Sequence, residues 1–281
     1  VVIANPAGVT CNGCGFINAS RATLTTGTPL MNGGNLDGYR VEGGTIRIEG
    51  AGMDATRTGY TDLIARAVEI NAGLWAQNLA VTAGANTVNA DNAQATPIAA
   101  APGSGAAPAF AIDVASLGGM YAGKITLVGT EAGVGVRNAG HLGASAGEVR
   151  VTVDGMLTNS GNVAAAGSIG IAATTGIVNS GNLYAGGDLA LATQGDIESR
   201  GTDTVVAAAG NATLAATGVG SRIVGDAASL FAAGVAADGS LVGNGRLDLA
   251  ATTTVAASGR HIASGDLAIA AEHLDLADSV N

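Results

Sequence analysis

Basic and aromatic residues are scarce in this sequence. Only 12 of its 281 residues are Lys or Arg, against 22 Asp or Glu, and the formal net charge is −10 at pH 7. Proteins that bind nucleic acids neutralise phosphates with clustered Lys and Arg, so the composition predicts no nucleic-acid partner. Aromatic residues make up 3% of the chain, whereas Gly contributes 45 residues. A globular core of this size would use more large side chains, and we therefore expect a thin, repetitive core.

Long apolar runs and an initiator methionine are also absent. No run reaches the length of about 18 apolar residues that a membrane-spanning helix needs, so the sequence predicts no membrane span. The chain opens with Val1 inside an apolar stretch and without a signal peptide, and we expect it to be a fragment whose upstream part is missing.

The first stretch carries a turn between short strands. The apolar residues 1–3 predict a strand, which leads into a turn formed by Asn5, Pro6, Ala7 and Gly8. Proline is pre-set for the second position of such a turn, and glycine adopts backbone angles that other residues avoid. The sequence continues as CNGCGFIN over residues 11–18 and as RATLTTG over residues 21–27.

These words resemble the signature of the large exoproteins of two-partner secretion, the filamentous haemagglutinin and CdiA-type family. Members carry an NPNG-like turn, often CNGCGFIN, and then RATLTTG; here Ala7 stands where Asn is usual. The resemblance covers the first third of the chain. It assigns five residues to the secretion signature: Asn5, Pro6, Gly8, Cys11 and Cys14. Whether they touch a partner or only shape the turn stays open, and we favour shape.

The two cysteines, Cys11 and Cys14, form a CxxC pair. Zinc needs about four ligands, yet there is no second pair and the three histidines lie far away in sequence. A thioredoxin-like redox site needs a βαβ context, which is missing. In the extracellular setting that the resemblance implies, we favour a local disulfide that pins the turn, with free thiols as the alternative.

The C-terminal half repeats with a period of about 20 residues. The apolar pair Ile169 and Ile171 returns as Leu189 and Leu191. Alternation at period two marks half-buried strands, and the density of Gly, Asn, Ser and Thr disfavours helices. Leucine-rich repeats share the period but need more leucines and a helical turn in each repeat. The sequence therefore predicts an all-β fold, a right-handed parallel β-helix whose aliphatic rows stack about 4.8 Å apart.

Other landmarks recur along these repeats. Asn138, Asn159 and Asn179 fall at predicted corners, where tolerance of left-handed backbone and side-chain hydrogen bonds favour asparagine, and we expect a structural role for them. Residues 182–191 resemble the haemagglutinin repeats of the same exoproteins, which the family places after its secretion domain. Between Leu214 and Leu247 the register slips, so we expect an insertion within residues 226–244.

The N-terminal part shows less regular spacing. We expect Phe16 and Trp75, which are rare large apolar residues, to plug the interior. Residues 89–109 carry Pro97, Pro102 and Pro108 and predict an excursion outside the coils. We therefore divide the chain into the rear part of a two-partner secretion domain (1–88), a loop-rich extra-helical segment (89–122) and haemagglutinin-type β-helix repeats (123–281).

Acidic residues that could support catalysis come in three pairs: Asp54 with Asp62, Asp196 with Glu198, and Asp275 with Asp278. Converging carboxylates would suit a β-helical polysaccharide-cleaving enzyme, which is the alternative function. The acids do not recur at one coil position with a base nearby. The motif HExxH, the P-loop and the calcium-binding GGxGxD are absent from the sequence. We predict no enzyme, no catalytic residue, no cofactor and no metal.

The resemblance implies a function in secretion. Family members pass the periplasm and leave through a dedicated outer-membrane TpsB transporter, whose periplasmic domains they engage. We expect a secreted or surface-exposed bacterial protein that serves adhesion or contact-dependent growth inhibition. A host or neighbouring-cell receptor would be contacted by regions outside this chain. A β-helix can fold as it emerges, because each new coil buries its apolar edge on the last.

Overall fold

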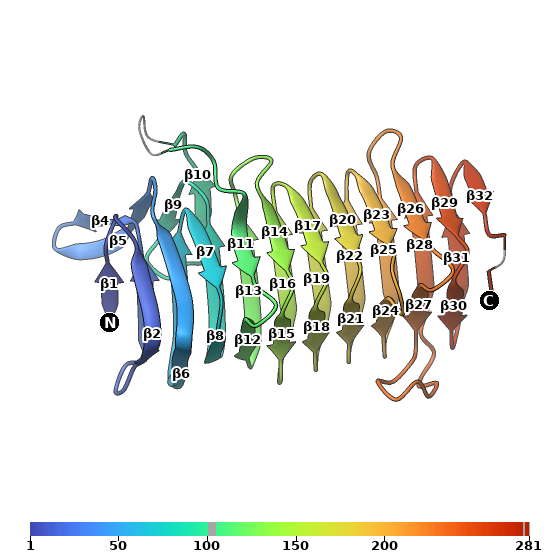
Figure 1. The fold of residues 1–281 in the computed structure, drawn as a ribbon, viewed down its shortest axis with the longest axis horizontal. Coiled ribbons are helices and arrows are strands. Elements are labelled where there is room, and N and C mark those ends of the chain that lie inside the picture. The colour runs from blue at the N-terminus through green and yellow to red at the C-terminus, as the bar shows by residue number, and fades with distance from the viewer. Residues whose placement is uncertain (101–104, 278, 281) are drawn as a thin grey trace. The chain divides into compact units, whose positions relative to one another are not determined.

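The computed structural model describes residues 1–100, 105–277 and 279–280, and within them the chain forms strands, turns and loops but no helix (Figure 1). No helix able to cross a membrane is therefore found in that part of the chain. The chain divides into two compact units, Val1–His141 with Thr152–Gly155 and Leu142–Val151 with Met156–Asn281. In each unit most strands pair in parallel with a strand one coil away, which confirms the predicted all-β parallel β-helix.

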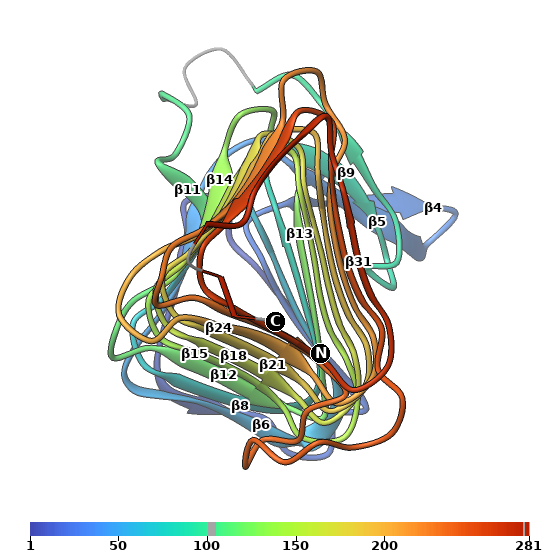
Figure 2. The same cartoon turned by 90° about the vertical axis from the view of Figure 1, so that its right-hand side faces the viewer.

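The coils of the first unit are built from these strands: β1 (Val2–Ala4), β2 (Val9–Gly15), β3 (Arg21–Thr25), β6 (Thr45–Ala65), β7 (Ala67–Ile70), β8 (Gly73–Ala83), β11 (Phe110–Val114), β12 (Gly119–Ala122), β13 (Lys124–Gly129) and β14 (Gly135–Asn138). Figure 2 shows β12, β13 and β14 following one another counter-clockwise as the coils advance toward the viewer. This is the right-handed sense that parallel crossovers favour.

Aliphatic rows line the interior of the first unit. Leu24, Leu63, Val81 and Leu127 are successive register partners, and each is at most 2% exposed. Burial of one such side chain is worth about 1.5–3 kcal/mol. Each coil is thus stabilised chiefly by the coil on which it stacks.

The predicted interior position of Trp75 is wrong. Its neighbours Leu74 and Ala76 point into the core and are 0% and 8% exposed, and side chains alternate along a strand. Trp75 must therefore point outward, and it is 42% exposed. Phe16 is half-buried beyond the end of β2 and does not belong to the buried core either.

A second, antiparallel sheet, which the sequence pattern does not predict, lies outside the coils of this unit. Its strands are β4 (Thr28–Asn32), β5 (Asn35–Val41), β9 (Asn86–Asn89) and β10 (Ala95–Pro97). Tyr39, Val41 and Val88 of this sheet pack on Ile64 of the coil, and all four side chains are fully buried. The sheet covers the outward side chain of Ile64, which water would otherwise reach.

The predicted loop-rich segment at 89–122 is only partly extra-helical. Pro97 lies in β10, as an excursion outside the coils requires, whereas Pro102 and the rest of residues 101–104 lie outside the described residues. Strands β11 and β12 stack in parallel on β7 and β8, and Ile112 and Met120 are fully buried. Residues 110–122 therefore belong to the coils, because their alternating apolar side chains have an interior to fill.

The second unit repeats one coil shape, and its strands are β15 (His141–Ala144) and β16 (Val149–Val153), which both contain a unit boundary, β17 (Met156–Asn159), β18 (Asn162–Ala165), β19 (Ile169–Ala173), β20 (Gly176–Asn179), β21 (Asn182–Ala185), β22 (Leu189–Thr193), β23 (Asp196–Ser199), β24 (Val205–Ala208), β25 (Ala212–Ala216), β26 (Arg222–Gly225), β27 (Leu230–Ala233), β28 (Leu247–Ala251), β29 (Thr254–Ala257), β30 (Arg260–Ala263), β31 (Leu267–Ala270) and β32 (His273–Asp275).

The repeat period predicts the register of this unit correctly. Ile169 pairs with Leu189, and the row continues through Ala212, Leu247 and Leu267. Ile169 and Leu189 are each 1% exposed. The rows of apolar residues that recur in the sequence are therefore rows of stacked side chains in the structure.

Asn159 and Asn179 form side-chain hydrogen bonds at the corner, as expected, but they do not adopt left-handed backbone. Asn159 and Asn179 are buried, and Asn159 Nδ2 donates to Asn179 Oδ1 over 2.8 Å. Asn179 Nδ2 donates in turn to the carbonyl oxygen of Gly181. Among the described residues, positive φ angles outside glycine occur only at Asn18, Asn92 and Asp203. The amide ladder holds the corner, so extended backbone is sufficient there.

The structure contains the insertion expected within residues 226–244, and it occupies the later part of that range. Strands β26 and β27 stay in register with β29 and β30, so the residues up to Ala233 belong to the coil. The extra residues lie between β27 and β28, where Val235 forms an isolated antiparallel bridge with Leu241.

Candidate functional site

The signature turn is closed by the backbone and by one side chain. The amide of Gly8 donates to the carbonyl oxygen of Asn5 over 3.0 Å, and the amide of Ala7 donates to Asn5 Oδ1 over 3.2 Å. The amide of Asn5 donates to the carbonyl oxygen of Thr25 in the adjacent strand. Pro6 has no amide proton to leave unpaired, and its fixed φ suits the second turn position.

The turn also stacks closely on the next coil. Gly8 has φ +132°, and a Cβ atom there would lie 3.0 Å from the carbonyl oxygen of Thr45. Gly44 has φ +81°, and a Cβ atom there would lie 2.6 Å from the carbonyl oxygen of Pro6. Both positions therefore require glycine. Ala7 is exposed, and its contribution to the turn is a backbone amide, which any residue but proline supplies.

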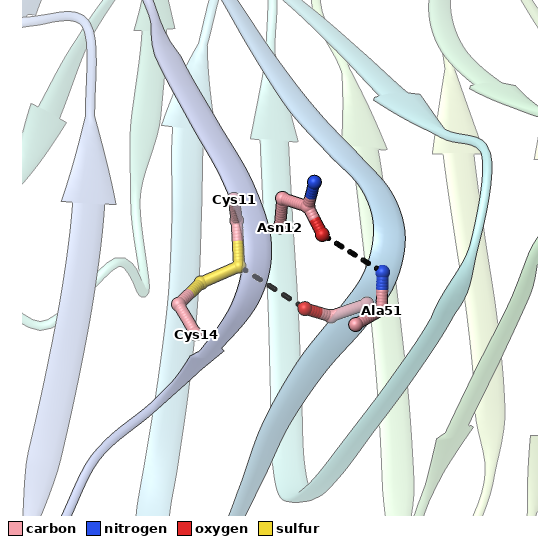
Figure 3. The surroundings of a disulfide bond; sticks show 5 residues. Cys11, Asn12, Cys14 and Ala51 are labelled. Carbon is pink, nitrogen blue, oxygen red and sulfur yellow. Dashed lines mark hydrogen bonds between the residues drawn. A yellow bond between two sulfur atoms is a disulfide. The ribbon is translucent and has the colours of Figure 1, made fainter.

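The two cysteines follow the turn on β2. The structure joins Cys11 to Cys14 by a disulfide bond, with 5.6 Å between their Cα atoms (Figure 3). Cys11 is buried, and its Sγ lies 3.5 Å from the carbonyl oxygen of Gly52 on β6. The strand is irregular here, since the pairing of β2 with β6 shifts between Asn12 and Cys14. The disulfide therefore spans a bulge.

Asn12 fastens the same bulge to the opposite strand. Its Oδ1 accepts a hydrogen bond of 2.9 Å from the amide of Ala51 (Figure 3). A Cβ atom at Gly50, which has φ +58°, would lie 2.3 Å from Asn12 Oδ1. The CNGC segment thus contacts the irregular part of β6 through Asn12 and Cys11.

The acids weighed for catalysis occupy unlike surroundings. Asp54 is exposed, and hydrogen bonds from Thr56 hold the pKa of its carboxyl below the usual range. Asp62 is 2% exposed, and burial raises its pKa although Arg21 lies 3.0 Å away. Asp196 forms an ion pair with Arg222. In the described part of the chain no three His, Cys, Asp or Glu side chains gather as metal ligands would. Asp278 lies outside that part.

Two family models match this chain. Residues 1–164 match the TPS secretion domain, and residues 144–216 and 207–280 match the haemagglutinin repeat. The first match reaches residue 164, well beyond residue 88, where the sequence division ends that domain.

Curated relatives are similar over the same N-terminal part. The chain is 59% identical over 165 residues to Toxin CdiA of Yersinia pestis and 49% identical over 166 residues to tRNA nuclease CdiA-2 of Burkholderia pseudomallei (strain 1026b). These matches cover 59% of this chain and 5% of each relative. The chain thus spans a small part of the length of the curated relatives that it matches.

A solved structure is similar over most of the chain. It is the crystal structure of the filamentous hemagglutinin secretion domain, with 34% sequence identity and a TM-score of 0.54. The similarity covers 80% of this chain and 66% of that one.

Proposed function

The chain belongs to the TPS secretion domain family, and from this premise we propose that it is the secretion and rod-forming segment of a large bacterial exoprotein. The observation that carries the proposal is the match of residues 1–164 to the secretion domain. The hydrogen-bonded signature turn, which lies in the first coil of the fold, supports it. The parent protein leaves through a dedicated outer-membrane TpsB transporter and is displayed at the cell surface or released.

The β-helix supplies the mechanism of this export. An extended chain that emerges from a pore can add coils one at a time, since each coil needs only the preceding one as a template. Each aliphatic pair that enters the stack contributes about 3–6 kcal/mol of burial. Folding outside the cell would therefore hold the exported segment there and oppose its return.

We assign a shaping role to the signature residues. Asn5, Pro6 and Gly8 set the direction in which the chain passes from β1 into β2, and the disulfide of Cys11 with Cys14 keeps the β2 bulge closed in the oxidising periplasm and outside. The division into a secretion domain followed by haemagglutinin-type repeats belongs to this proposal. The segment itself does no catalysis; adhesion or contact-dependent inhibition is carried by regions of the parent protein outside this chain, which also contact the receptor.

The experiment is an export assay in bacteria. The chain, preceded by a Sec signal peptide, is expressed with and without its cognate TpsB transporter, and the medium and the protease-accessible cell surface are analysed by immunoblotting. Transporter-dependent appearance outside the cell supports the proposal. Equal amounts outside with and without the transporter, or retention in the periplasm in both cases, contradict it.

A further inference from the structure

A short loop of the antiparallel sheet reaches back onto the coils of the first unit. Strands β9 and β10 pair antiparallel, and residues 90–94 form the loop of this hairpin. Asn89 closes the loop, because its Oδ1 accepts hydrogen bonds of 2.9 Å from the amides of Ala93 and Gln94. Asn92 lies in the loop with φ +56°, in the left-handed region that asparagine tolerates. The loop is therefore held in one shape.

Two adjacent residues of this loop connect three strands of the coils. The Oδ1 of Asn92 accepts a hydrogen bond of 2.7 Å from Thr82 Oγ1 on β8, and its Nδ2 donates to Asp62 Oδ1 on β6 over 3.4 Å. The carbonyl oxygen of Asp91 accepts a hydrogen bond of 2.7 Å from Arg21 Nη1 on β3. Residues 91 and 92 thus hold one side chain from each of three stacked strands.

Asp62 is the centre of these contacts. It is 2% exposed, and its Oδ2 also accepts hydrogen bonds from Arg21 Nη1 over 3.0 Å and from Thr23 Oγ1 over 3.1 Å. Hydrogen bonds to an ionised carboxylate are stronger than those between neutral groups. Thr82 is buried too, so its bond to Asn92 is shielded from water. Breaking these bonds is costly, since it leaves buried donors and acceptors without partners.

This connection reaches beyond neighbouring strands of the stack. In a solenoid each repeat contacts its neighbours, so coils can open one at a time. Strand β3 pairs with β6, and β6 pairs with β8, so that β6 separates β3 from β8. The loop bridges all three. Opening of β3 therefore also costs the bond from Arg21 to a loop that is anchored on β6 and β8.

We propose that residues 89–94 are a staple that makes β3, β6 and β8 open as one cooperative unit, and we call this loop the β9–β10 staple. The apolar contact of Tyr39 and Val88 with Ile64 lies in the same antiparallel sheet and supports the closed state. Because the staple follows β8 in the chain, it closes after these three strands have formed. It then holds the exported coils against stepwise unfolding, a consequence that rests on the function proposed above.

The experiment is hydrogen–deuterium exchange of the purified, folded full chain, read out by mass spectrometry. Asn92→Gly removes both side-chain bonds of the staple, and glycine tolerates the left-handed backbone. Asn18→Gly is the matched control, because Asn18 also has φ +56° and is exposed outside the staple. Thr82→Val removes only the bond from β8 and keeps the shape of the side chain. Its control is Thr193→Val, which changes a buried threonine of the second unit.

We expect the amides of β3 to exchange about tenfold faster in Asn92→Gly and about threefold faster in Thr82→Val, because each lost bond lowers the cost of opening. Both controls should leave β3 within about twofold of the wild type. Thr82→Val keeps the test valid if Asn92→Gly does not fold, since the change is on β8 and the effect is measured on β3. Faster exchange confined to β8 and residues 89–94, or unchanged exchange, overturns the staple.

The export assay separates the staple from the proposed function. Asn92→Gly should appear outside the cell in the same transporter-dependent way as the wild type, and trypsin should then cut it after Arg21 sooner. Equal cleavage of the two chains contradicts the holding role of the staple. Export of the wild type without the transporter contradicts the proposed function instead, and the exchange measurement still decides the staple, because it needs no transporter.

Discussion

Arg66 and Glu131 form an ion pair that joins two corners of the first unit across 65 positions of sequence. Arg66 Nε lies 3.0 Å from Glu131 Oε2, and Arg66 Nη2 lies 2.7 Å from Glu131 Oε1. The side chains are 6% and 17% exposed. The pair can form only when the residues on both sides of the excursion at 89–109 are in place, so it couples the early coils to the later ones.

Removal of one partner of this pair should destabilise the protein strongly. Glu131→Ala leaves the guanidinium of Arg66 buried without its carboxylate, and we expect a loss of about 2–4 kcal/mol in the free energy of unfolding, measured by urea denaturation. Glu69→Ala is the matched control, because Arg47 and Glu69 form a similar two-bond pair that is 47% and 34% exposed. That variant should lose less than about 1 kcal/mol. Equal losses for the two variants would show that burial of the Arg66 pair has no energetic role.

The stacking of the signature turn is tested by a pair of glycines. Gly44→Ala adds a Cβ atom 2.6 Å from the carbonyl oxygen of Pro6, at a position with φ +81°. Gly33→Ala adds one at φ +57° with no atom within 4 Å. We expect Gly33→Ala to cost about 1 kcal/mol, from backbone strain alone, and Gly44→Ala at least about 2 kcal/mol. Limited proteolysis should cut the N-terminal residues of Gly44→Ala sooner. Equal stability of the two variants would contradict the close stacking of the turn.

The buried amide ladder should matter more than an exposed one. Asn159 Nδ2 donates to Asn179 Oδ1 and also to the carbonyl oxygen of Gly161. Asn179→Ala removes the first of these acceptors, and the loss of a buried hydrogen bond costs about 1–3 kcal/mol. Asn182→Ala removes an equivalent bond to Asn162, which is exposed to water, and should cost less than about 0.5 kcal/mol. Thermal unfolding of both variants makes the comparison. A lower Tm for Asn182→Ala than for Asn179→Ala would mean that the buried ladder does not hold the corner.

The disulfide is expected to be formed in the exported protein. Mass spectrometry after treatment with iodoacetamide should find Cys11 and Cys14 unmodified unless the protein is first reduced. Because the closed loop is so short, the double variant Cys11→Ser with Cys14→Ser should lose about 2 kcal/mol or less. Alkylation of both cysteines in the unreduced exported chain would show that no disulfide spans the β2 bulge.

The buried carboxyl of Asp62 predicts a pH dependence of stability. Burial raises its pKa above the ordinary value of 3.8, against the opposing effects of Arg21, Thr23 and Asn92. Because the pKa of Asp62 is higher in the folded than in the unfolded protein, protonation of this carboxyl stabilises the fold. The stabilisation is complete at pH values below the pKa of the unfolded state, and it is lost as the pH rises through the pKa of the folded state. The free energy of unfolding of Asp62→Asn, relative to wild type, should therefore grow between pH 4 and pH 7. Urea titrations across this range provide the measurement, and a difference that falls with pH would reverse the sign that we assign.

The sequence predicts the second unit better than the first. The pairing of Ile169 with Leu189 can be predicted because similar residues recur there at the period of the repeat. The spacing in the sequence therefore gives the register of the stacked strands. The only sequence feature that indicates the antiparallel sheet is the two-glycine turn at Gly33 and Gly34, which is typical of a hairpin. Nothing in that turn predicts that Tyr39 will pack on Ile64, because the contact depends on where the coil presents an uncovered side chain.

In the candidate site, too, the sequence predicts local features but not those that depend on the stacking of coils. The turn at Asn5 and Gly8 follows from local residue preferences, whereas the required glycine at Gly44 follows only from stacking of the next coil. The size of Trp75 predicts an interior position, whereas its place on the strand between Leu74 and Ala76 predicts an outward one. Side chains alternate between the two faces along a strand, and this alternation, not side-chain volume, decides which face a residue occupies.

Translocation in a purified system tests most directly whether this chain is exported through the transporter. The unfolded chain is added to liposomes that contain only the cognate TpsB transporter, with liposomes that lack it as the control, and protected chain is measured after protease digestion. We expect protection in the transporter-containing vesicles alone, followed by trypsin resistance of the folded coils when the vesicles are dissolved. Absence of protection in both preparations, or equal protection in both, would contradict the claim that residues 1–164 direct export through this transporter.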